Sequence, residues 1–429
     1  MKETLVRGVR KILPKGLVRL LEEGYRRSRV WLISARYGFP ARGLRVIAVT
    51  GTNGKTTTVA YINSILKAAG HTTAMFGTAT IEVAGESKLN DTNTTVATTA
   101  TMQRFFAQAR QAKVDFVVLE VTSQALDQHK LDSVPIEAAV MTNLTQDHLD
   151  YHHTMEAYAD AKARLFQMNP RLVVLNRDDE WYKRFSAYAG SEMTMSYGTD
   201  TEADCRIASV QLYKDGSDIQ LIVDHQTELA LSAQLPGKFN VYNVTAAAAV
   251  AYLLHLDLEA IRQGVAQLAG VPGRQERIDL GQPYGIIVDY AHTPDALQQL
   301  LETLRHLTKR RLILVFGATG DRDRGKRPIM GRIASELADR IIVTDEESYN
   351  EDPASIRSQL MQGIIEAKGE ARAEEVADRR AAIEKALSIA RPDDAVVITG
   401  MGHEQFRVIA GQRLPWNDAQ VVRDILGGH

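Results

Sequence analysis

The most informative segment of the sequence is a glycine-rich loop between a predicted strand and a predicted helix. It reads Gly51-Thr52-Asn53-Gly54-Lys55-Thr56-Thr57, with an apolar run over 47–50 before it and a helical pattern over about 55–69 after it. In loops of this kind backbone N–H groups surround phosphate oxygens, the lysine binds the β- and γ-phosphates, and the next hydroxyl ligates Mg²⁺. Val49 stands where the general pattern has another glycine, so the loop is a variant. We predict that residues 51–57 bind a nucleoside triphosphate.

Two further polar clusters follow buried-strand patterns. Glu120 comes directly after the apolar run 116–119, and the segment Asn143-Leu144-Thr145-Gln146-Asp147-His148-Leu149-Asp150-Tyr151-His152 follows the run 138–141. Ligands of open α/β sheets bind at the carboxyl ends of strands, so both clusters suit metal and phosphate chemistry. Taken singly, Glu120 also fits a surface carboxylate, and residues 143–152 also fit a polar loop with satisfied histidines.

The strand and helix patterns predict an α/β protein of three parts. Residues 1–45 form a basic arm with an imperfect helical rhythm. Residues 46–270 form a central ATP-binding domain with a mostly parallel sheet, which includes a hairpin around Asp215-Gly216-Ser217. A Gly/Pro-containing break at 269–273 precedes a C-terminal Rossmann-like α/β domain, residues 271–429.

Composition and charge narrow the class of protein. The 429 residues include one cysteine, Cys205, which excludes a disulfide scaffold and a cysteine-rich zinc site. No apolar run approaches the roughly 20 residues that span a bilayer, so we expect a soluble, cytoplasmic protein. The arm has 12 Lys/Arg and 3 Asp/Glu, a balance of +9, whereas the rest of the chain has a balance of −11. The acidic body gives no electrostatic support for nucleic-acid binding, and we expect a monomer.

Together, segments spread over residues 46–429 resemble the signatures of the Mur ligase family. The closest branch is that of the UDP-N-acetylmuramoyl-tripeptide synthetases, which add the third residue of the peptidoglycan stem. The segments that carry the resemblance are Thr50–Thr57, Leu119–Ser123, Asn143–His152, Ala161–Ala163, Leu235–Asn243, Val271–Arg274, Asp289–Asp295 and Gly320–Pro328.

The resemblance implies an ATP-dependent, ADP-forming amide ligase. ATP phosphorylates a substrate carboxylate, and the amine of an amino acid then attacks the acyl-phosphate. By resemblance, Lys55, Glu120, His148 and Lys162 are catalytic, and Thr56, Glu120 and His148 hold Mg²⁺ together with Lys162 as a carbamate. A solvated helical lysine is the alternative for Lys162. The family's other ATP contacts match Asn240, Asn243, Arg274 and Asp289.

The substrate contacts implied by the resemblance lie mainly in the C-terminal part. They match Asn93, Thr94, Thr95, Ser123, Arg322, Glu346, Glu347, Tyr349, Gly400 and Glu404. The partners implied are a muramoyl-peptide-type acceptor and a free amino acid.

The arm is the first departure from the family pattern. Tripeptide synthetases carry an N-terminal uridine-binding domain of about a hundred residues, and about 45 residues are too few for one. UDP recognition is therefore in doubt, and a lipid-linked or otherwise altered acceptor is one hypothesis. The basic and apolar content of residues 1–45 suits peripheral contact with an anionic membrane. A helix that packs on its own body is equally compatible.

The remaining departures concern the incoming amino acid and its surroundings. Tyr349 replaces the arginine of the family's Asp-Asn-Pro-Arg motif, which pairs with the distal carboxylate of meso-diaminopimelate. Glu346 and Glu347 precede it and favour a cationic side chain, such as lysine or ornithine, although a solvated acidic loop is as compatible. Met401 stands where a lysine is usual, and Gln124 where a histidine is usual.

Two rival functions stay open from the sequence. One is amide ligation on another poly-acid, of the folylpolyglutamate or cyanophycin type. The other is a P-loop protein that binds ATP without ligating anything, which would not need Glu120, His148 and Lys162 together.

Overall fold

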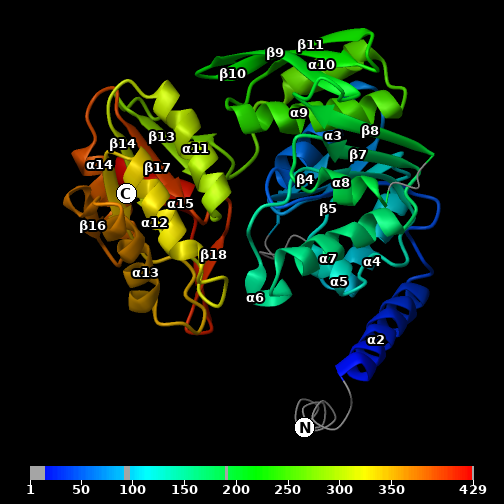
Figure 1. Cartoon of the computed structure of the whole chain (residues 1–429), viewed down its shortest axis with the longest axis horizontal. Helices are drawn as coiled ribbons and strands as arrows, with labels where there is room; N and C mark the ends of the chain where they lie inside the picture. Colours follow the sequence, from blue (N-terminus) through cyan, green and yellow to red (C-terminus); the bar gives the residue numbers. More distant parts are fainter. Residues whose placement is uncertain (1–14, 91–96, 189–191, 428–429) are drawn as a thin grey trace.

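The computed structural model describes residues 15–90, 97–188 and 192–427. Two lobes lie side by side, and a long helix projects from the lower end of one of them (Figure 1). The first lobe contains the sheet strands between Arg45 and Ala233, and the second contains those between Glu276 and Pro415. None of the described helices is long and apolar enough to cross a membrane.

The sheet of the first lobe is mostly parallel at its centre and antiparallel at its two ends. Its 11 strands, in spatial order, are β11 (Thr227–Ala233), β10 (Gly216–Val223), β9 (Cys205–Tyr213), β8 (Met193–Gly198), β7 (Leu172–Asn176), β6 (Ile136–Met141), β1 (Arg45–Thr50), β5 (Phe116–Glu120), β2 (Thr73–Phe76), β3 (Thr80–Val83) and β4 (Glu86–Leu89). Val49 of β1 is paired with Glu120 of β5 and Val140 of β6. The loops after these three strands therefore leave the sheet at one edge.

Helices cover both faces of this sheet, which explains why its central strands are apolar on both sides. One face packs on α3 (Lys55–Ala68), α9 (Lys238–Leu253) and α10 (Leu258–Gln267). The other face packs mainly on α4 (Thr99–Gln111), α5 (Ser123–Asp127) and α7 (Met155–Gln167). Two short helices, α6 (Leu149–His152) and α8 (Tyr182–Ser186), lie in the connections.

The second lobe repeats the architecture on a smaller scale. Its main sheet has the order β12 (Glu276–Arg277), β13 (Gly285–Asp289), β17 (Ala395–Thr399), β14 (Leu312–Phe316), β15 (Arg340–Val343) and β16 (Ala373–Glu375). One face carries α11 (Pro294–Leu307), α12 (Lys326–Leu337) and α13 (Pro353–Glu366), and the other carries α14 (Arg379–Ile389) and α15 (Asp418–Gly427). A 3₁₀ turn (Glu370–Arg372) and the hairpin β18 (Phe406–Ile409) and β19 (Gln412–Pro415) complete it.

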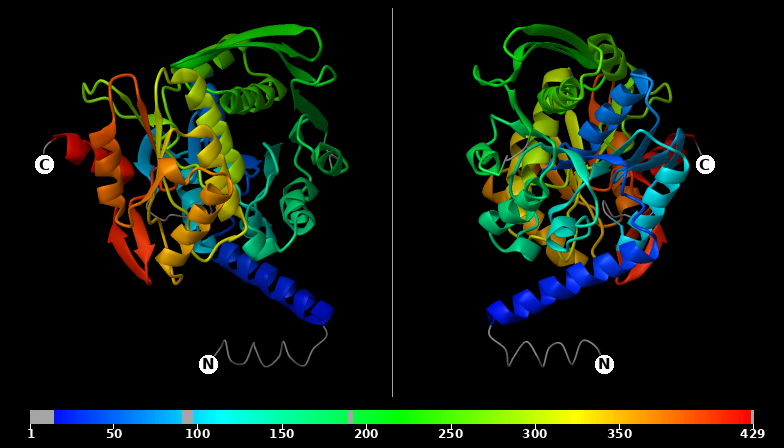
Figure 2. Two further views of the ribbon diagram at one scale, coloured as in Figure 1. Left: turned by 60° about the vertical axis from the view of Figure 1, so that its left-hand side comes forward. Right: turned by 90° about the vertical axis from the view of Figure 1, so that its right-hand side faces the viewer.

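Helix α2 (Lys15–Arg36) lies outside both sheets. Both views in Figure 2 show it running along the outer side of the first lobe. It packs through one face only: Val30 and Ser34 are buried, and Arg26 pairs with Asp127 at 3.0 Å. Part of the predicted arm is thus a helix that packs on its own body.

The structure confirms the predicted α/β class with a mostly parallel first sheet. The predicted helix over 55–69 is α3, and the predicted hairpin is β9–β10, in which Tyr213 is paired with Gly216. Pro353 occupies the first turn of α13, where its missing N–H has no helical partner to lose. The limits of the three predicted parts stay a prediction.

Close packing between α10 and α3 supports the nucleotide loop from behind, and it gives a test of the fold. A Cβ at Gly264 would collide with the backbone of Ile65. Gly264→Ala should lower the free energy of unfolding by about 1–3 kcal/mol, because neither helix backbone yields easily. Urea unfolding followed by circular dichroism measures the change.

The matched control is Gly24→Ala in α2, where a Cβ meets nothing within 4 Å. Alanine is the better helix former by about 1 kcal/mol, so the control should not destabilise the protein. Equal stability of Gly264→Ala and wild type would contradict the packing described for α3 and α10.

Candidate active site

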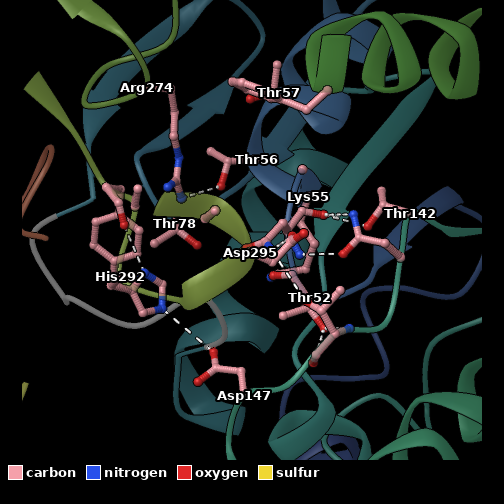
Figure 3. A pocket seen from close by; sticks show the side chains of 18 of the residues that line it. Thr52, Lys55, Thr56, Thr57, Thr78, Thr142, Asp147, Arg274, His292 and Asp295 are labelled. Carbon is pink, nitrogen blue, oxygen red and sulfur yellow. Dashed lines mark hydrogen bonds and ion pairs between the residues drawn. The ribbon is translucent and has the colours of Figure 1, made fainter. Parts of the chain in front are cut away.

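The carboxyl ends of strands from both sheets face one cavity between the lobes. The cavity has a volume of about 740 Å³. From the first lobe it is lined by Thr52–Thr57, Glu120 and residues after β6, and from the second by Asp289–His292, Glu346, Glu347 and Gly400. Figure 3 shows side chains from the two lobes converging on the glycine-rich loop.

The loop after β1 has the backbone that a phosphate-binding loop requires. Gly54 has φ 82° and precedes α3, and a Cβ at this position would collide with the amide of Asn243. The Lys55 ammonium donates to the Thr52 carbonyl at 2.8 Å. Burial lowers the pKa of Lys55, and the carboxylate of Glu120 opposes this effect. A bound phosphate group would place a negative charge beside this cation and so offset the free-energy cost of burying it.

Glu120 is held directly beside the loop. Its Oε2 accepts hydrogen bonds from the Thr56 hydroxyl at 3.0 Å and from the Thr78 amide at 2.8 Å. The residue is only 3% exposed, so the alternative of a surface carboxylate is wrong. Thr56 and Glu120 form the hydroxyl–carboxylate pair that the sequence predicted.

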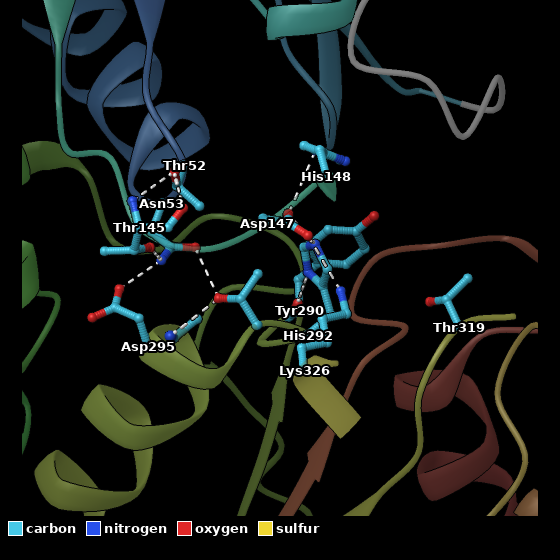
Figure 4. Close-up of polar contacts among 12 residues, drawn as sticks. Thr52, Asn53, Thr145, Asp147, His148, Tyr290, His292, Asp295, Thr319 and Lys326 are labelled. Atoms are coloured by element: carbon cyan, nitrogen blue, oxygen red, sulfur yellow. Dashed lines mark hydrogen bonds and ion pairs between the residues drawn. The ribbon is translucent and has the colours of Figure 1, made fainter. Parts of the chain in front are cut away.

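Asp147 and His148 lie opposite the loop in a network with the second lobe (Figure 4). Asp147 lies 3.4 Å from the Lys326 ammonium and 3.7 Å from His292 Nε2. Burial raises the pKa of Asp147, but Lys326 and the two histidines outweigh it and hold the pKa well below its usual range. Burial lowers the pKa of His148 to about 3, so its ring is neutral at neutral pH and able to ligate a metal. The segment is thus more than a polar loop.

Lys162 projects from α7 toward the underside of the loop. Its Nζ donates to the Gly51 carbonyl at 2.6 Å and lies 4.6 Å from the centre of the Tyr158 ring. The residue is 1% exposed, which rules out the alternative of a solvated lysine. Burial, and then the like charge of Lys55, hold the pKa of Lys162 well below its usual range. A neutral amine is the form that reacts with carbon dioxide.

Polar contacts join the lobes at the loop and beside it. Asn53 Nδ2 donates to Asp295 at 2.6 Å, and an Arg274 N–H donates to the Thr56 hydroxyl at 3.1 Å. Another contact is the Lys326–Asp147 ion pair beside the loop. These contacts place second-lobe side chains next to the residues predicted to bind phosphate.

The other residues predicted to contact ATP also line the cavity. Asn243 Nδ2 donates to the side-chain oxygen Oδ1 of Asn240 at 3.1 Å, and Asn240 Nδ2 donates to the backbone carbonyl of Pro236 at 2.8 Å. The carboxylate of Asp289 accepts from the backbone N–H groups of Gln275 and Ala291, both at 2.7 Å. Asp289 thus holds the loop that carries Arg274.

A buried acidic group lies in the second lobe, where three predicted substrate residues meet. Glu346 and Glu347 follow β15, Glu404 follows β17, and all three are buried. Burial, then Glu347 and Glu346, raise the pKa of Glu404 well above its usual range, and burial and Glu346 raise that of Glu347. Glu346 Oε2 is buried without a partner among the described residues. The alternative of a solvated acidic loop is therefore wrong.

The remaining predicted residues of this region surround the acidic group. Gly400 has φ 107°, and a Cβ there would collide with the Glu346 carboxylate. The Tyr349 hydroxyl donates to Glu347 at 3.1 Å, and the Arg322 guanidinium lies 5.4 Å from the centre of the Tyr349 ring. Tyr349 therefore holds Glu347 by a hydrogen bond, and its side chain offers no positive charge to a ligand.

Two predictions need comment. Ser123 does not line the cavity: it is buried, and its hydroxyl is 2.9 Å from His152 Nε2. Its neighbours Thr122 and Gln124 line the cavity instead, because α5 turns the serine inward. Asn93, Thr94 and Thr95 lie outside the described residues.

Sequence reasoning assigned no role to several residues that shape the site. These are Asp147, His292, Asp295 and Lys326. All lie inside motifs that the sequence analysis recognised, so proximity to those motifs was the available signal. Their cross-lobe partners depend on how the two sheets face each other.

The residues beside the loop fit a magnesium ion. No cluster of three or more His, Cys, Asp or Glu side chains within the described ranges is arranged as a complete metal site. Mg²⁺ is usually held by one or two carboxylates together with substrate phosphates and waters. The Thr56–Glu120 pair, beside a phosphate-binding loop, supplies that kind of partial shell.

The chain is similar to known proteins over most of its length. Residues 49–251 match the model of the Mur ligase middle domain, and residues 273–402 match that of the Mur ligase glutamate ligase domain. A diaminopimelate-adding ligase of Syntrophomonas wolfei, named UDP-N-acetylmuramoyl-L-alanyl-D-glutamate–2,6-diaminopimelate ligase, is 40% identical over 418 residues, which are 96% of this chain and 84% of the relative. The chain belongs to the Mur ligase family.

Other relatives agree with this assignment. The Bacillus cereus protein of the same name is 38% identical and covers 94% of this Mur ligase, with 82% of its own length matched. A solved structure of that name has 38% identity and a TM-score of 0.61, covering 90% of this chain and 78% of its own. The structure of a folylpolyglutamate synthase of Mycobacterium tuberculosis has a TM-score of 0.73 at 22% identity. The match covers 93% of this chain and 95% of the synthase. This last likeness shows a shared fold alone.

Family membership settles the class of reaction. This Mur ligase is an enzyme of peptidoglycan synthesis, an ATP-dependent and ADP-forming acid–amino-acid ligase. The alternative of a P-loop protein that binds ATP without ligating is therefore wrong.

His403 lies behind the acidic group and gives a pH-dependent test of this region. Burial lowers its pKa to about 3, and its ring lies 5.2 Å from that of Tyr290. Below about pH 6.5 the unfolded chain binds a proton that the folded chain excludes, so stability falls as the pH falls. Because of His403, the free energy of unfolding should fall by about 2 kcal/mol as the pH is lowered from about 7 to about 5.

His403→Gln should remove that part of the pH dependence. Urea unfolding at the two pH values measures the difference, and His225→Gln at an exposed site is the matched control. Identical pH slopes for His403→Gln and wild type would show that His403 becomes protonated in the folded protein.

Proposed function

We propose that this Mur ligase adds a third stem residue with a cationic side chain, such as lysine or ornithine, to a muramoyl-dipeptide-type acceptor. One observation carries the proposal: the phosphate loop and the buried acidic group line the same cavity. The phosphate loop suits ATP and an acceptor carboxylate, and the buried acidic group suits a diamino acid. We further propose the limits 46–270 and 271–429 for the two ligase domains.

The proposed reaction has two steps. An oxygen of the acceptor carboxylate attacks the γ-phosphorus of ATP, and ADP leaves. The amine of the incoming amino acid then attacks the acyl carbon, forms the amide and releases phosphate. Residues 51–57 and Asn240 and Asn243 bind ATP, while Arg274 reaches the loop from the second lobe, close enough to contact the phosphates. The cavity between the lobes limits water, which would hydrolyse the acyl-phosphate.

Mg²⁺ would be held by Thr56 and Glu120, with His148 and a carbamylated Lys162 near a second ion, and would neutralise charge on the phosphates. The structure supports the modification of Lys162 in two ways. Its amine is buried, and its lowered pKa favours the neutral, nucleophilic form. A carbamate would also replace a cation beside Lys55 with an anion, which removes the like-charge repulsion.

The preference for a cationic side chain rests on charge balance in the acidic group. Burial first, and then the mutual repulsion of Glu346, Glu347 and Glu404, raise the pKa values of Glu347 and Glu404. An ammonium group would offset that repulsion, whereas a second carboxylate would add to it. Tyr349 offers no bidentate partner for the distal carboxylate of diaminopimelate.

The acceptor stays the least specified part of the proposal. The curated relatives are named for ligation onto UDP-N-acetylmuramoyl-L-alanyl-D-glutamate, so this is the first acceptor to test. A lipid-linked precursor is the next candidate. Poly-acid acceptors of the folylpolyglutamate or cyanophycin type rank lower, because the folylpolyglutamate synthase shares only the fold.

The decisive experiment compares lysine, ornithine and meso-diaminopimelate with ATP, Mg²⁺ and UDP-N-acetylmuramoyl-dipeptide. Phosphate release is measured, and mass spectrometry identifies the product. We expect a tripeptide product, with kcat/KM for lysine or ornithine at least about 10-fold above that for meso-diaminopimelate. Glu347→Gln should lower kcat/KM for the preferred diamine by about 10- to 100-fold, because a buried partner of the ammonium is lost.

Tyr349→Arg should shift the preference toward meso-diaminopimelate by restoring a bidentate cation. Glu259→Gln, an exposed carboxylate on α10, is the matched control and should leave all three rates unchanged. A clear preference for meso-diaminopimelate by the wild type would overturn the specificity assignment. No product with any amino acid, despite ATP binding, would overturn the proposed acceptor.

The assignment of Lys162 has its own test. Lys162→Ala should lower ligase activity by about 100-fold or more, and added formate or acetate should restore part of it by occupying the vacated site. Lys183→Ala, at an exposed position of α8, is the matched control. If the variant binds ATP and unfolds at the wild-type temperature but responds to no carboxylic acid, the carbamate assignment is wrong.

A further inference from the structure

Helix α2 exposes a continuous apolar stripe on the side that faces away from the body. Leu17, Leu21, Tyr25 and Leu32 are 45%, 52%, 67% and 63% exposed. At 3.6 residues per turn these positions fall within roughly 80° of the helix circumference. Trp31, 57% exposed, extends the stripe at one edge.

The opposite face of α2 packs against the first lobe. Val30 is buried, and the Ser34 hydroxyl lies 2.8 Å from that of Ser133. On the same side, Arg164 lies 3.5 Å from Glu23. The helix therefore cannot turn its stripe inward without breaking these contacts, and the exposure of the stripe shows that it faces away from the protein.

Positive charge flanks the stripe. Arg29 and Arg36 lie along one border, and Arg27 lies along the other next to Trp31; all three are exposed. Of the two acidic residues of the helix, Glu23 lies on the packed face, and Glu22 lies about 20° beyond Arg29. An apolar face bordered by arginines, with an aromatic ring at its edge, is the pattern of helices that lie in a membrane interface.

From this arrangement we infer that α2 docks this enzyme on an anionic lipid surface. The stripe enters the boundary between head groups and acyl chains, and Arg29 and Arg36 contact lipid phosphates, whereas Arg27 pairs with Asp132 of the body. Charge complementarity favours this occupant: residues 1–45 have a balance of +9 within a chain whose remainder is acidic. An anionic surface attracts the arm and repels the body, which fixes the orientation of the enzyme. The inference does not depend on which amino acid the enzyme adds.

The experiment uses the full chain and vesicles of phosphatidylglycerol and phosphatidylcholine in equal amounts, with pure phosphatidylcholine vesicles alongside. We expect co-sedimentation with the anionic vesicles only, and a decrease as salt is raised. The double variant Leu21→Ser/Leu32→Ser should lower the bound fraction by about 10-fold or more, because two apolar side chains no longer enter the lipid. Fluorescence of Trp31 should shift to shorter wavelength on binding, and Trp31→Phe should remove that shift.

The matched control is Leu212→Ser/Leu280→Ser, which changes two leucines of similar exposure, 49% and 52%, far along the chain from α2. It should bind vesicles like the wild type. Thermal unfolding and ATP hydrolysis of both double variants should match the wild type, because all four side chains are exposed. Absence of binding to anionic vesicles, or equal loss in both double variants, would overturn the inference. The wild type could instead be a dimer that does not bind vesicles. If Leu21→Ser/Leu32→Ser then makes it monomeric, the stripe binds a second copy of the chain and not a membrane.

Discussion

The phosphate loop is the point on which both lobes depend. It is the connection between β1 and α3, and it also supplies first-lobe partners of contacts to the second lobe, including Asn53 with Asp295 and Thr56 with Arg274. Residues predicted to bind phosphate and Mg²⁺ therefore also contact the other lobe. A metal ion on the Thr56 hydroxyl would compete with Arg274 for the same oxygen, so this contact would link ligand binding to the arrangement of the lobes.

Charge divides the cavity into two halves. Lys55, Arg274 and Lys326 line the half of the cavity at the loop, where their positive charge suits phosphates and an acceptor carboxylate. The second half contains the buried acidic group. Burial strengthens both fields, because the protein surroundings screen charge less than bulk water does. Under the function proposed above, the anionic acceptor and the cationic side chain of the incoming amino acid would be attracted to opposite sides of one cavity.

Much of the first lobe could be predicted because its signals are local. The long buried strands and the loop between β1 and α3 stand out in the sequence, and parallel strands place Glu120 and residues 143–148 at one edge. Short strands such as β2 and β3 carry too few residues to show a pattern. The cross-lobe pairs, and the inward turn of Ser123, depend on packing between segments far apart in the chain. No period or motif in the sequence encodes those distances.

Two of the departures from the family motifs fall in loops that follow strands of the second lobe. Tyr349 and Glu346 follow β15, whereas Met401 follows β17 and is fully buried. A lysine at position 401 would place a cation in an apolar site beside the acidic group, so methionine leaves the carboxylates without that counter-charge. Tyr349 removes a second cation and braces Glu347. Relative to the family motifs that the sequence resembles, both changes remove a cation from this region, and this loss is the basis of the amino-acid preference proposed above.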